Sequence, residues 1–251
     1  MSHHKEHHVK KKIPNKWLII AAVFILVPIL ILGYLGFVPL VSDIMGATTP
    51  VDLGVKVTEK DYASASAKLG RERETLPASK TPEESLKFTG SHKVDTEFTQ
   101  EEATVTMQTR KYRYNPIGND FQVRFNDDGT VEASGTLKLS NFRKYGKATG
   151  VSDEQADEIM GKAGLIKVNP AFYVKGTGYV ANNRVYLDVK EAKLGRLSLP
   201  SDALESNYVK RFVEDRIENI PGLDVESLKV EDGKLKFNGN YPDKSYYDTG
   251  E

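Results

Sequence analysis

The sequence predicts an α+β protein with one N-terminal transmembrane helix, followed by an extracytoplasmic region of antiparallel sheets with packed helices. Three observations lead to this class. Residues 17–41 contain no charged side chain, residues 55–242 alternate between helix-capping and hairpin patterns, and two hairpin segments in that region resemble each other in sequence. The third observation indicates that the outer region consists of two duplicated modules.

The uncharged stretch is long enough to cross a bilayer. A helix of 25 residues measures about 37 Å, against a hydrocarbon core of about 30 Å. Five lysines and one glutamate lie in residues 1–16, and the first charge after the stretch is Asp43. This asymmetry predicts a retained signal-anchor in the plasma membrane, with the basic, His-rich tail in the cytoplasm and the rest outside. A cleaved signal peptide, whose apolar run is typically about 7–15 residues, is the alternative.

The composition of the outer region excludes several classes of function. The chain has 35 basic and 35 acidic residues, so residues 17–251 carry 30 basic and 34 acidic ones. A slightly acidic domain is atypical of nucleic-acid binding, which needs a basic field. The absence of cysteine excludes disulfides, thiolate metal sites and cysteine nucleophiles.

Two segments have the signals of a capped helix. In residues 58–70, Thr58 can cap the first turn, Asp61 occupies the capping-box position and Gly70 can end the helix. Residues 152–164 repeat this pattern at an offset of 94.

The other elements are predicted from alternation, periodicity and turn residues. We expect a linker over residues 42–54, a loop over 71–85, a strand segment turning at Gly90 over 86–98 and a helix over 99–110. Hairpins are expected over residues 121–139, 172–189 and 225–241, and a long helix capped by Ser201 over 199–220.

The internal echo concerns residues 115–135 and 219–239. They align without a gap at an offset of 104 and share six residues, including Gly135 and Gly239. Asp-Gly hairpins also recur by chance, which is the alternative. The echo predicts α+β modules over residues 55–145 and 146–242, followed by a flexible tail over 243–251.

Histidine chemistry has little support in the sequence. His3, His4, His7 and His8 lie in a short polar tail, where we expect solvation and not a metal site. His92 is the single histidine of the outer region, and no Gly-x-Ser-x-Gly motif accompanies it. We therefore predict no catalytic residue, metal or cofactor.

Carboxylates and amides offer two further hypotheses. The turn with Asn126, Asp127, Asp128 and Glu132 has oxygen ligands of the kind that calcium prefers, but it lacks EF-hand spacing, and a hairpin turn explains it better. A pair of acids could also serve a wall hydrolase, although the sequence does not single out a pair.

The motif RKYRY interleaves basic and aromatic side chains. As a strand it would place Lys111 and Arg113 on one face and Tyr112 and Tyr114 on the other. These four residues are our candidate contacts for anionic headgroups or a polyanionic envelope polymer, and an ordinary half-exposed edge strand is the alternative.

The segments LGRLSLPSDALE and IPGLDVESLKVEDGKLKFNG, within residues 194–241, resemble exported, membrane-anchored envelope proteins, some of which look similar to the tubular lipid-binding families. Residues 98–139 carry a fainter resemblance. The resemblance to these families implies long curved sheets with a helix along them, enclosing an apolar groove for acyl chains. It implies no catalytic motif.

The sequence thus predicts a single-pass envelope protein whose outer domain binds lipid or an envelope polymer. Two alternatives stay open: a structural scaffold at the cell surface, and a carboxylate-dependent hydrolase of wall glycans. Protein partners and the oligomeric state do not follow from the sequence.

Overall fold

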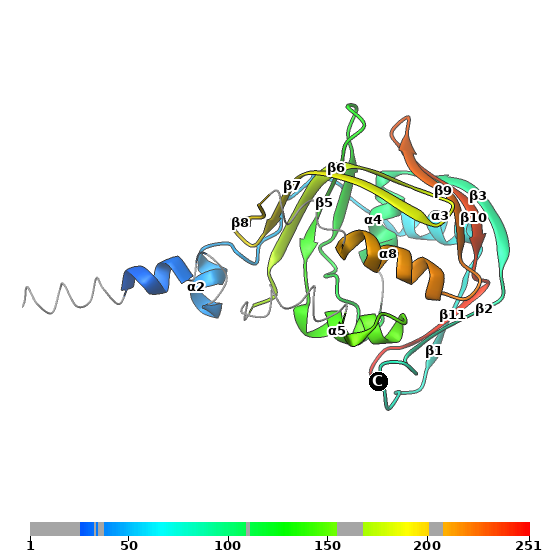
Figure 1. The fold of residues 1–251 in the computed structure, drawn as a ribbon, viewed down its shortest axis with the longest axis horizontal. Coiled ribbons are helices and arrows are strands. Elements are labelled where there is room, and N and C mark those ends of the chain that lie inside the picture. Colours follow the sequence, from blue (N-terminus) through cyan, green and yellow to red (C-terminus); the bar gives the residue numbers. More distant parts are fainter. Residues whose placement is uncertain (1–25, 33, 35–37, 109–110, 155–167, 201–207) are drawn as a thin grey trace, which may run out of the picture.

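The computed structural model describes residues 26–32, 34, 38–108, 111–154, 168–200 and 208–251. Within them the protein is an α+β fold with a large curved sheet, a small sheet and packed helices (Figure 1). The predicted α+β class is therefore confirmed for the described residues.

The large sheet has eight strands, and its described pairings are antiparallel. Its order is β3 (His92–Phe98), β10 (Lys234–Tyr241), β9 (Asp224–Glu231), β6 (Ala171–Ala181), β5 (Val131–Thr136) and β4 (Gln122–Phe125), with β7 (Arg184–Leu194) and β8 (Leu197–Ser198) beyond the other edge of β6. The long β6 binds β5 along its first half and β9 along its last residues, so one strand joins the two smaller hairpins.

The small sheet has the order β1 (Glu72–Leu76), β11 (Lys244–Asp248), β2 (Leu86–Thr89), with β1 and β11 parallel. Two chain segments connect it to the large sheet, because β2 continues into β3 and β10 continues into β11. Both bend at the same corner. Gly90 has a φ of +72° there, and a Cβ on it would collide with the carboxylate of Asp243, so the corner requires glycine.

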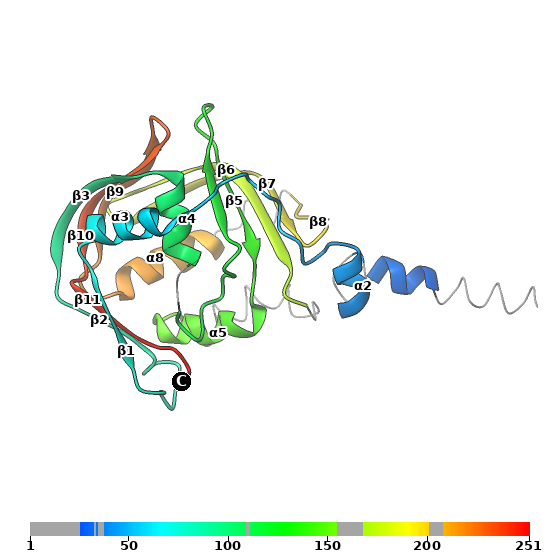
Figure 2. The same cartoon turned by 180° about the vertical axis from the view of Figure 1, so that it is seen from behind.

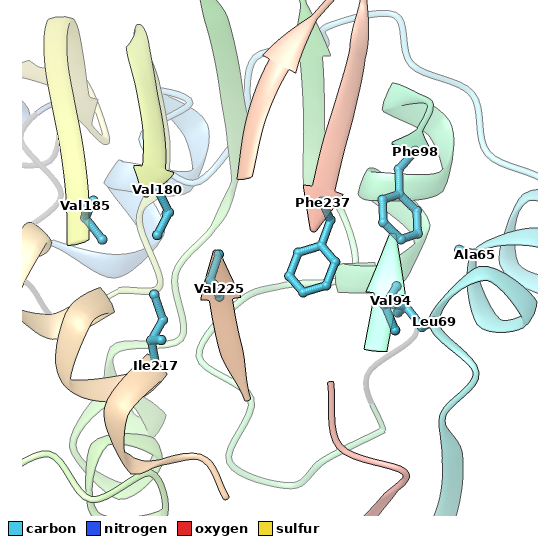
Figure 3. Packing of buried hydrophobic residues seen from close by; sticks show 9 residues of the cluster. All are labelled: Ala65, Leu69, Val94, Phe98, Val180, Val185, Ile217, Val225 and Phe237. Carbon is cyan, nitrogen blue, oxygen red and sulfur yellow. The ribbon is translucent and has the colours of Figure 1, made fainter. Parts of the chain in front are cut away.

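Helices α3 (Glu59–Leu69) and α8 (Tyr208–Asn219) contribute to the main core with the large sheet. Ala65 and Leu69 of α3 pack near Val94 and Phe98, whereas Ile217 of α8 lies toward the other end of the cluster (Figure 3). The cluster is completed by Val180, Val185, Val225 and Phe237. Helix α4 (Gln100–Gln108) packs on α3, α5 (Leu139–Ala148) follows β5, and α2 (Pro39–Ile44) precedes the domain.

The predicted capping signals are confirmed where the structure describes them. Helix α3 has the capping box of Thr58 and Asp61, and Gly70 ends it with a left-handed φ of +59°. In α4, Glu102 accepts a hydrogen bond from the backbone N of Thr99 and donates its own backbone N to the Thr99 hydroxyl. Residues 155–167 and Ser201, part of the other capping predictions, lie outside the described residues.

The three predicted hairpins are present as β4–β5, β6–β7 and β9–β10. The two echo hairpins differ in their turns: Phe125 pairs with Val131 across a five-residue loop, whereas Glu231 pairs with Lys234 across Asp232 and Gly233. Strands from both expected modules also share one sheet, because β3 pairs with β10 and β5 with β6. Duplication stays a prediction.

Three segments differ from expectation. Residues 71–85, expected as a loop, contain β1, and the expected flexible tail, residues 243–251, contains β11. Neither strand alternates apolar and polar side chains, and their pairing joins residues about 170 positions apart, so no local pattern predicts it. The expected linker, residues 42–54, begins within α2 and packs on the domain, since Leu53 donates its backbone N to Gln122 Oε1 at 2.8 Å.

The predicted transmembrane segment falls mainly outside the described residues, which include only 26–32, 34 and 38–41 of it. Residues 26–32 are helical, and Pro39 begins α2. Among the helices that the structure describes, none has both the length and the apolar character needed to cross a membrane.

Candidate functional site

A pocket of about 100 Å³ lies on the inner side of the corner between the two sheets, where α5 and the end of α8 approach the small sheet. Its lining contains four cationic and five aromatic side chains: Arg71, Arg73, Lys111 and Arg216, and Phe88, Tyr112, Tyr145, Tyr241 and Tyr247. We call it the corner pocket. Among the lining residues that the structure describes, none is a carboxylate.

The strand register of the small sheet determines which side chains enter the corner pocket. Arg73, Ser245 and Phe88 stand side by side on β1, β11 and β2, and all three line the pocket. Their sequence neighbours point to the other face, because strand side chains alternate. There Lys244 contacts the carboxylates of Glu72 at 2.8 Å and Glu74 at 3.2 Å. Glu72 and Glu74 of β1 therefore lie on the face away from the pocket, and Arg73 lies on the pocket face.

Aromatic partners position the arginines. Arg71 Nη1 donates a hydrogen bond to the Tyr241 hydroxyl at 2.9 Å, and Arg73 Nη1 donates one to Tyr62 at 3.3 Å. The guanidinium carbon of Arg216 lies 4.8 Å from the ring centroid of Tyr145. The guanidinium groups of Arg71 and Arg73 likewise lie near the rings of Tyr241 and Tyr62, an arrangement that suits a planar, delocalised cation.

The wall of the pocket beside α5 is a tyrosine cluster. Tyr112 lies 5.8 Å from Tyr114 in an edge-to-face arrangement and 6.1 Å from Tyr145, between ring centroids. Its hydroxyl is 2.6 Å from Ser85 Oγ, and burial raises the pKa of Tyr112 to about 12. Tyr112 is therefore neutral at physiological pH and presents a ring and a hydroxyl, without a negative charge.

The structure separates the four predicted contact residues. Residues 111–114 include a turn instead of the predicted strand, because Asn115 N bonds to Tyr112 O and Arg113 N bonds to Asp248 O. Lys111 and Tyr112 line the corner pocket. Tyr114 is buried, with the Arg113 guanidinium carbon 4.5 Å from its ring centroid.

Arg113 has a structural partner in Asp248, which is completely buried. Asp248 accepts hydrogen bonds from Arg113 Nη1 at 2.8 Å, from the backbone N of Ser79 at 2.8 Å and from Gly250 N at 2.7 Å. Burial opposes ionisation, but these hydrogen bonds outweigh it and hold the pKa of Asp248 well below its usual range. The pair holds the end of β11, which supplies Ser245 and Tyr247 to the corner pocket.

His92 is part of the corner and not of a catalytic triad. Its Nδ1 lies 2.7 Å from Asp243 Oδ1, and its Nε2 lies 3.0 Å from the carbonyl oxygen of Leu69. In a serine hydrolase that second nitrogen would face the nucleophile. The adjacent Ser91 hydroxyl instead donates to Gly222 O at 3.0 Å.

Carboxylate oxygens that the calcium hypothesis requires as ligands accept hydrogen bonds within the turn itself. Asp128 accepts hydrogen bonds from Thr130, and Asn126 donates to Glu132 at 3.3 Å. Glu132 also contacts Arg124 at 2.5 Å and Lys175 at 3.3 Å. Within the residues that the structure describes, no three His, Asp or Glu side chains gather as a metal site, and the tail histidines lie outside them.

Sequence reasoning missed most of the corner pocket. Arg71, Arg73 and Arg216 come from separate elements, and the two strands that frame the pocket, β1 and β11, were not predicted. One local signal was present, since Arg71 and Arg73 alternate with acids in a polar segment and so share a face of a strand.

Comparison with known proteins adds no assignment, since no family model, curated protein or solved structure matches the chain.

Proposed function

We propose that this chain is a single-pass, membrane-anchored envelope protein whose outer domain binds an anionic group of a lipid or of an envelope polymer. The observation that carries the proposal is the corner pocket, whose described lining has four cations, five aromatic rings and no carboxylate. Arginine forks bind phosphate and carboxylate bidentately, and aromatic rings pack on the apolar faces of a ligand. This combination suits a charged group carried on a larger molecule.

The size of the pocket limits what it encloses. About 100 Å³ is below the roughly 300–1,000 Å³ of sites that enclose a drug-sized ligand. One phosphate or carboxylate group fits, and the rest of the ligand stays outside. Headgroups and polymer units meet this condition, whereas an enclosed acyl chain needs more room.

Membrane anchoring is supported by the sequence. Residues 17–41 lack charge, and the basic residues lie ahead of them. A domain held in this way would meet ligands at the membrane surface or in the adjoining envelope.

Native mass spectrometry of the full chain, purified in detergent from the cells that make it, tests this function. We expect an anionic species to co-purify and to be lost from the double variant Arg73→Gln, Lys111→Gln. The matched control is Lys87→Gln, which removes an exposed cation from β2 on the face away from the pocket. A clean apo mass for all three proteins would contradict the proposal.

A scaffold function is the second candidate, and one surface favours it. Tyr179 and Tyr186 stack at 4.6 Å between ring centroids on neighbouring strands, yet both are nearly half exposed. Exposed aromatic pairs are enriched at protein interfaces. Crosslinking in cells separates the two functions: a protein captured by a photo-crosslinker at residue 186, together with no anionic ligand, would favour the scaffold.

A further inference from the structure

Helix α2 has a reversed pattern of exposure. Ser42 is completely buried against the domain, whereas Leu40 and Ile44 are 78% and 86% exposed. A helix on the surface of a soluble domain normally buries its aliphatic residues and exposes its hydroxyls. Two large aliphatic side chains, one turn apart on the outward side, therefore need an apolar environment that the described part of the chain does not supply.

The position of α2 on the domain is fixed by the residues that follow it. Ala47 is fully buried, and its carbonyl oxygen accepts a hydrogen bond from Ala171 N, the first residue of β6, at 3.0 Å. Arg196 Nε donates to Met45 O at 3.0 Å. Further along, Gln122 Oε1 accepts from Leu53 N. The direction of Leu40 and Ile44 is thus set relative to the whole outer domain.

The apolar surface continues toward the N-terminus. Helical residues 26–32 expose their aliphatic side chains, and no charged residue occurs between position 17 and Asp43. Both views place this helix and α2 at one end of the molecule, with β1, β2 and β11 at the opposite end (Figures 1 and 2). The covering environment of α2 must be continuous with that of the uncharged segment, and a lipid bilayer meets this condition.

We infer that α2 lies in the interface of the bilayer and so fixes the orientation of the domain on the anchoring membrane. The inference rests on the proposed anchoring.

The absence of cysteine makes a direct test simple, because a single introduced thiol is unique. The variants are Ile44→Cys and Leu40→Cys in the full chain, each labelled with an environment-sensitive fluorophore and reconstituted into phosphatidylcholine–phosphatidylglycerol nanodiscs. Both positions are exposed, so labelling leaves the core intact. Lys87→Cys on β2, at the far end, is the matched control.

We expect a blue-shifted emission at positions 40 and 44 and its loss when the nanodiscs contain lipids with brominated acyl chains. The label at position 87 should emit as in water and stay unquenched. Water-like emission at all three positions, in a protein that resists alkaline extraction from membranes, would overturn the placement of α2 in the bilayer interface. It would not affect the proposed anchoring by the uncharged segment. Release by alkaline extraction would overturn the anchor itself. Shielding at position 44 that lipid quenchers do not reach would show a second copy or another protein covering α2, which also overturns the inference.

Discussion

Arg113 and Asp248, 135 positions apart in the sequence, form an ion pair of 2.8 Å between a partly exposed guanidinium and a completely buried carboxylate. The pair joins the RKYRY motif to the last strand of the chain. It thereby holds together two segments that line the corner pocket, because Lys111 and Tyr112 precede Arg113 and Tyr247 precedes Asp248.

Replacing Asp248 by Asn should lower the free energy of unfolding by about 3 kcal/mol, because it removes the charge partner of Arg113 and leaves buried donors poorly matched. Asp232→Asn is the control: Asp232 lies at the exposed turn of β9–β10, where a change within about 0.5 kcal/mol is expected. Urea unfolding of both variants measures the difference. Equal effects would show that the pair does not stabilise the fold.

The same pair predicts a loss of stability in acid. The pKa of Asp248 is held below its usual value in the folded protein, so the unfolded state binds its proton first as the pH falls. Its contribution is present above the unfolded pKa of about 4 and is lost as the pH falls toward the folded pKa. The stability difference between wild type and Asp248→Asn should therefore be constant from pH 5 to 7 and narrow below about pH 4. A pH-independent difference would contradict this.

Glu102 should couple α3 to α4. It contacts Lys68 of α3 at 2.6 Å while accepting the capping hydrogen bond of Thr99, and it is almost fully buried. Burial opposes ionisation, but the bonds from Lys68, Ser64 and Thr99 lower its pKa overall. A double-mutant cycle with Lys68→Met and Glu102→Gln should give a coupling of about 0.5–3 kcal/mol.

The control for this cycle is Glu101→Gln with Lys68→Met. Glu101 lies one position earlier on α4 and contacts Gln100. Equal coupling energies in the two cycles would show that the Lys68–Glu102 ion pair does not stabilise the packing of α3 on α4.

Gly239, one of the residues shared by the two echo hairpins, should tolerate no side chain. A Cβ there would collide with the carbonyl oxygen of Asp224 in β9, at a register irregularity of the sheet. Gly239→Ala should therefore cost about 1–3 kcal/mol. Gly233→Asn is the control, because Gly233 has open space around it and a left-handed φ of +70° that asparagine adopts. Thermal unfolding distinguishes the two, and a tolerant Gly239 would indicate that β9 and β10 can separate locally.

Local signals predicted much of the fold. The cap of Thr58, the turn at Gly90 and the Asn182–Asn183 hairpin all depend on residues within a few positions of one another. The parallel pairing of β1 with β11 depends on the corner that brings both ends of the domain together, so a short polar segment and a C-terminal tail gave no sign of it. The candidate site was predicted only in part for the same reason: Lys111 and Tyr112 form a local motif, whereas Arg73 and Arg216 meet them only in the folded chain.

Equilibrium binding of defined polymers tests the central claim most directly. The full chain in nanodiscs is titrated with poly(glycerol phosphate), polygalacturonate and neutral dextran, and the titration is repeated with Arg73→Gln, Lys111→Gln and with Lys87→Gln. We expect at least one polyanion to bind while dextran does not. We also expect the pocket variant to lose about 10-fold or more in affinity, since a hydrogen bond to a charged group contributes about 1.5–3 kcal/mol, and Lys87→Gln to bind like wild type. Equal binding of dextran, or a pocket variant that binds like wild type, would contradict the assignment of the corner pocket as an anion site.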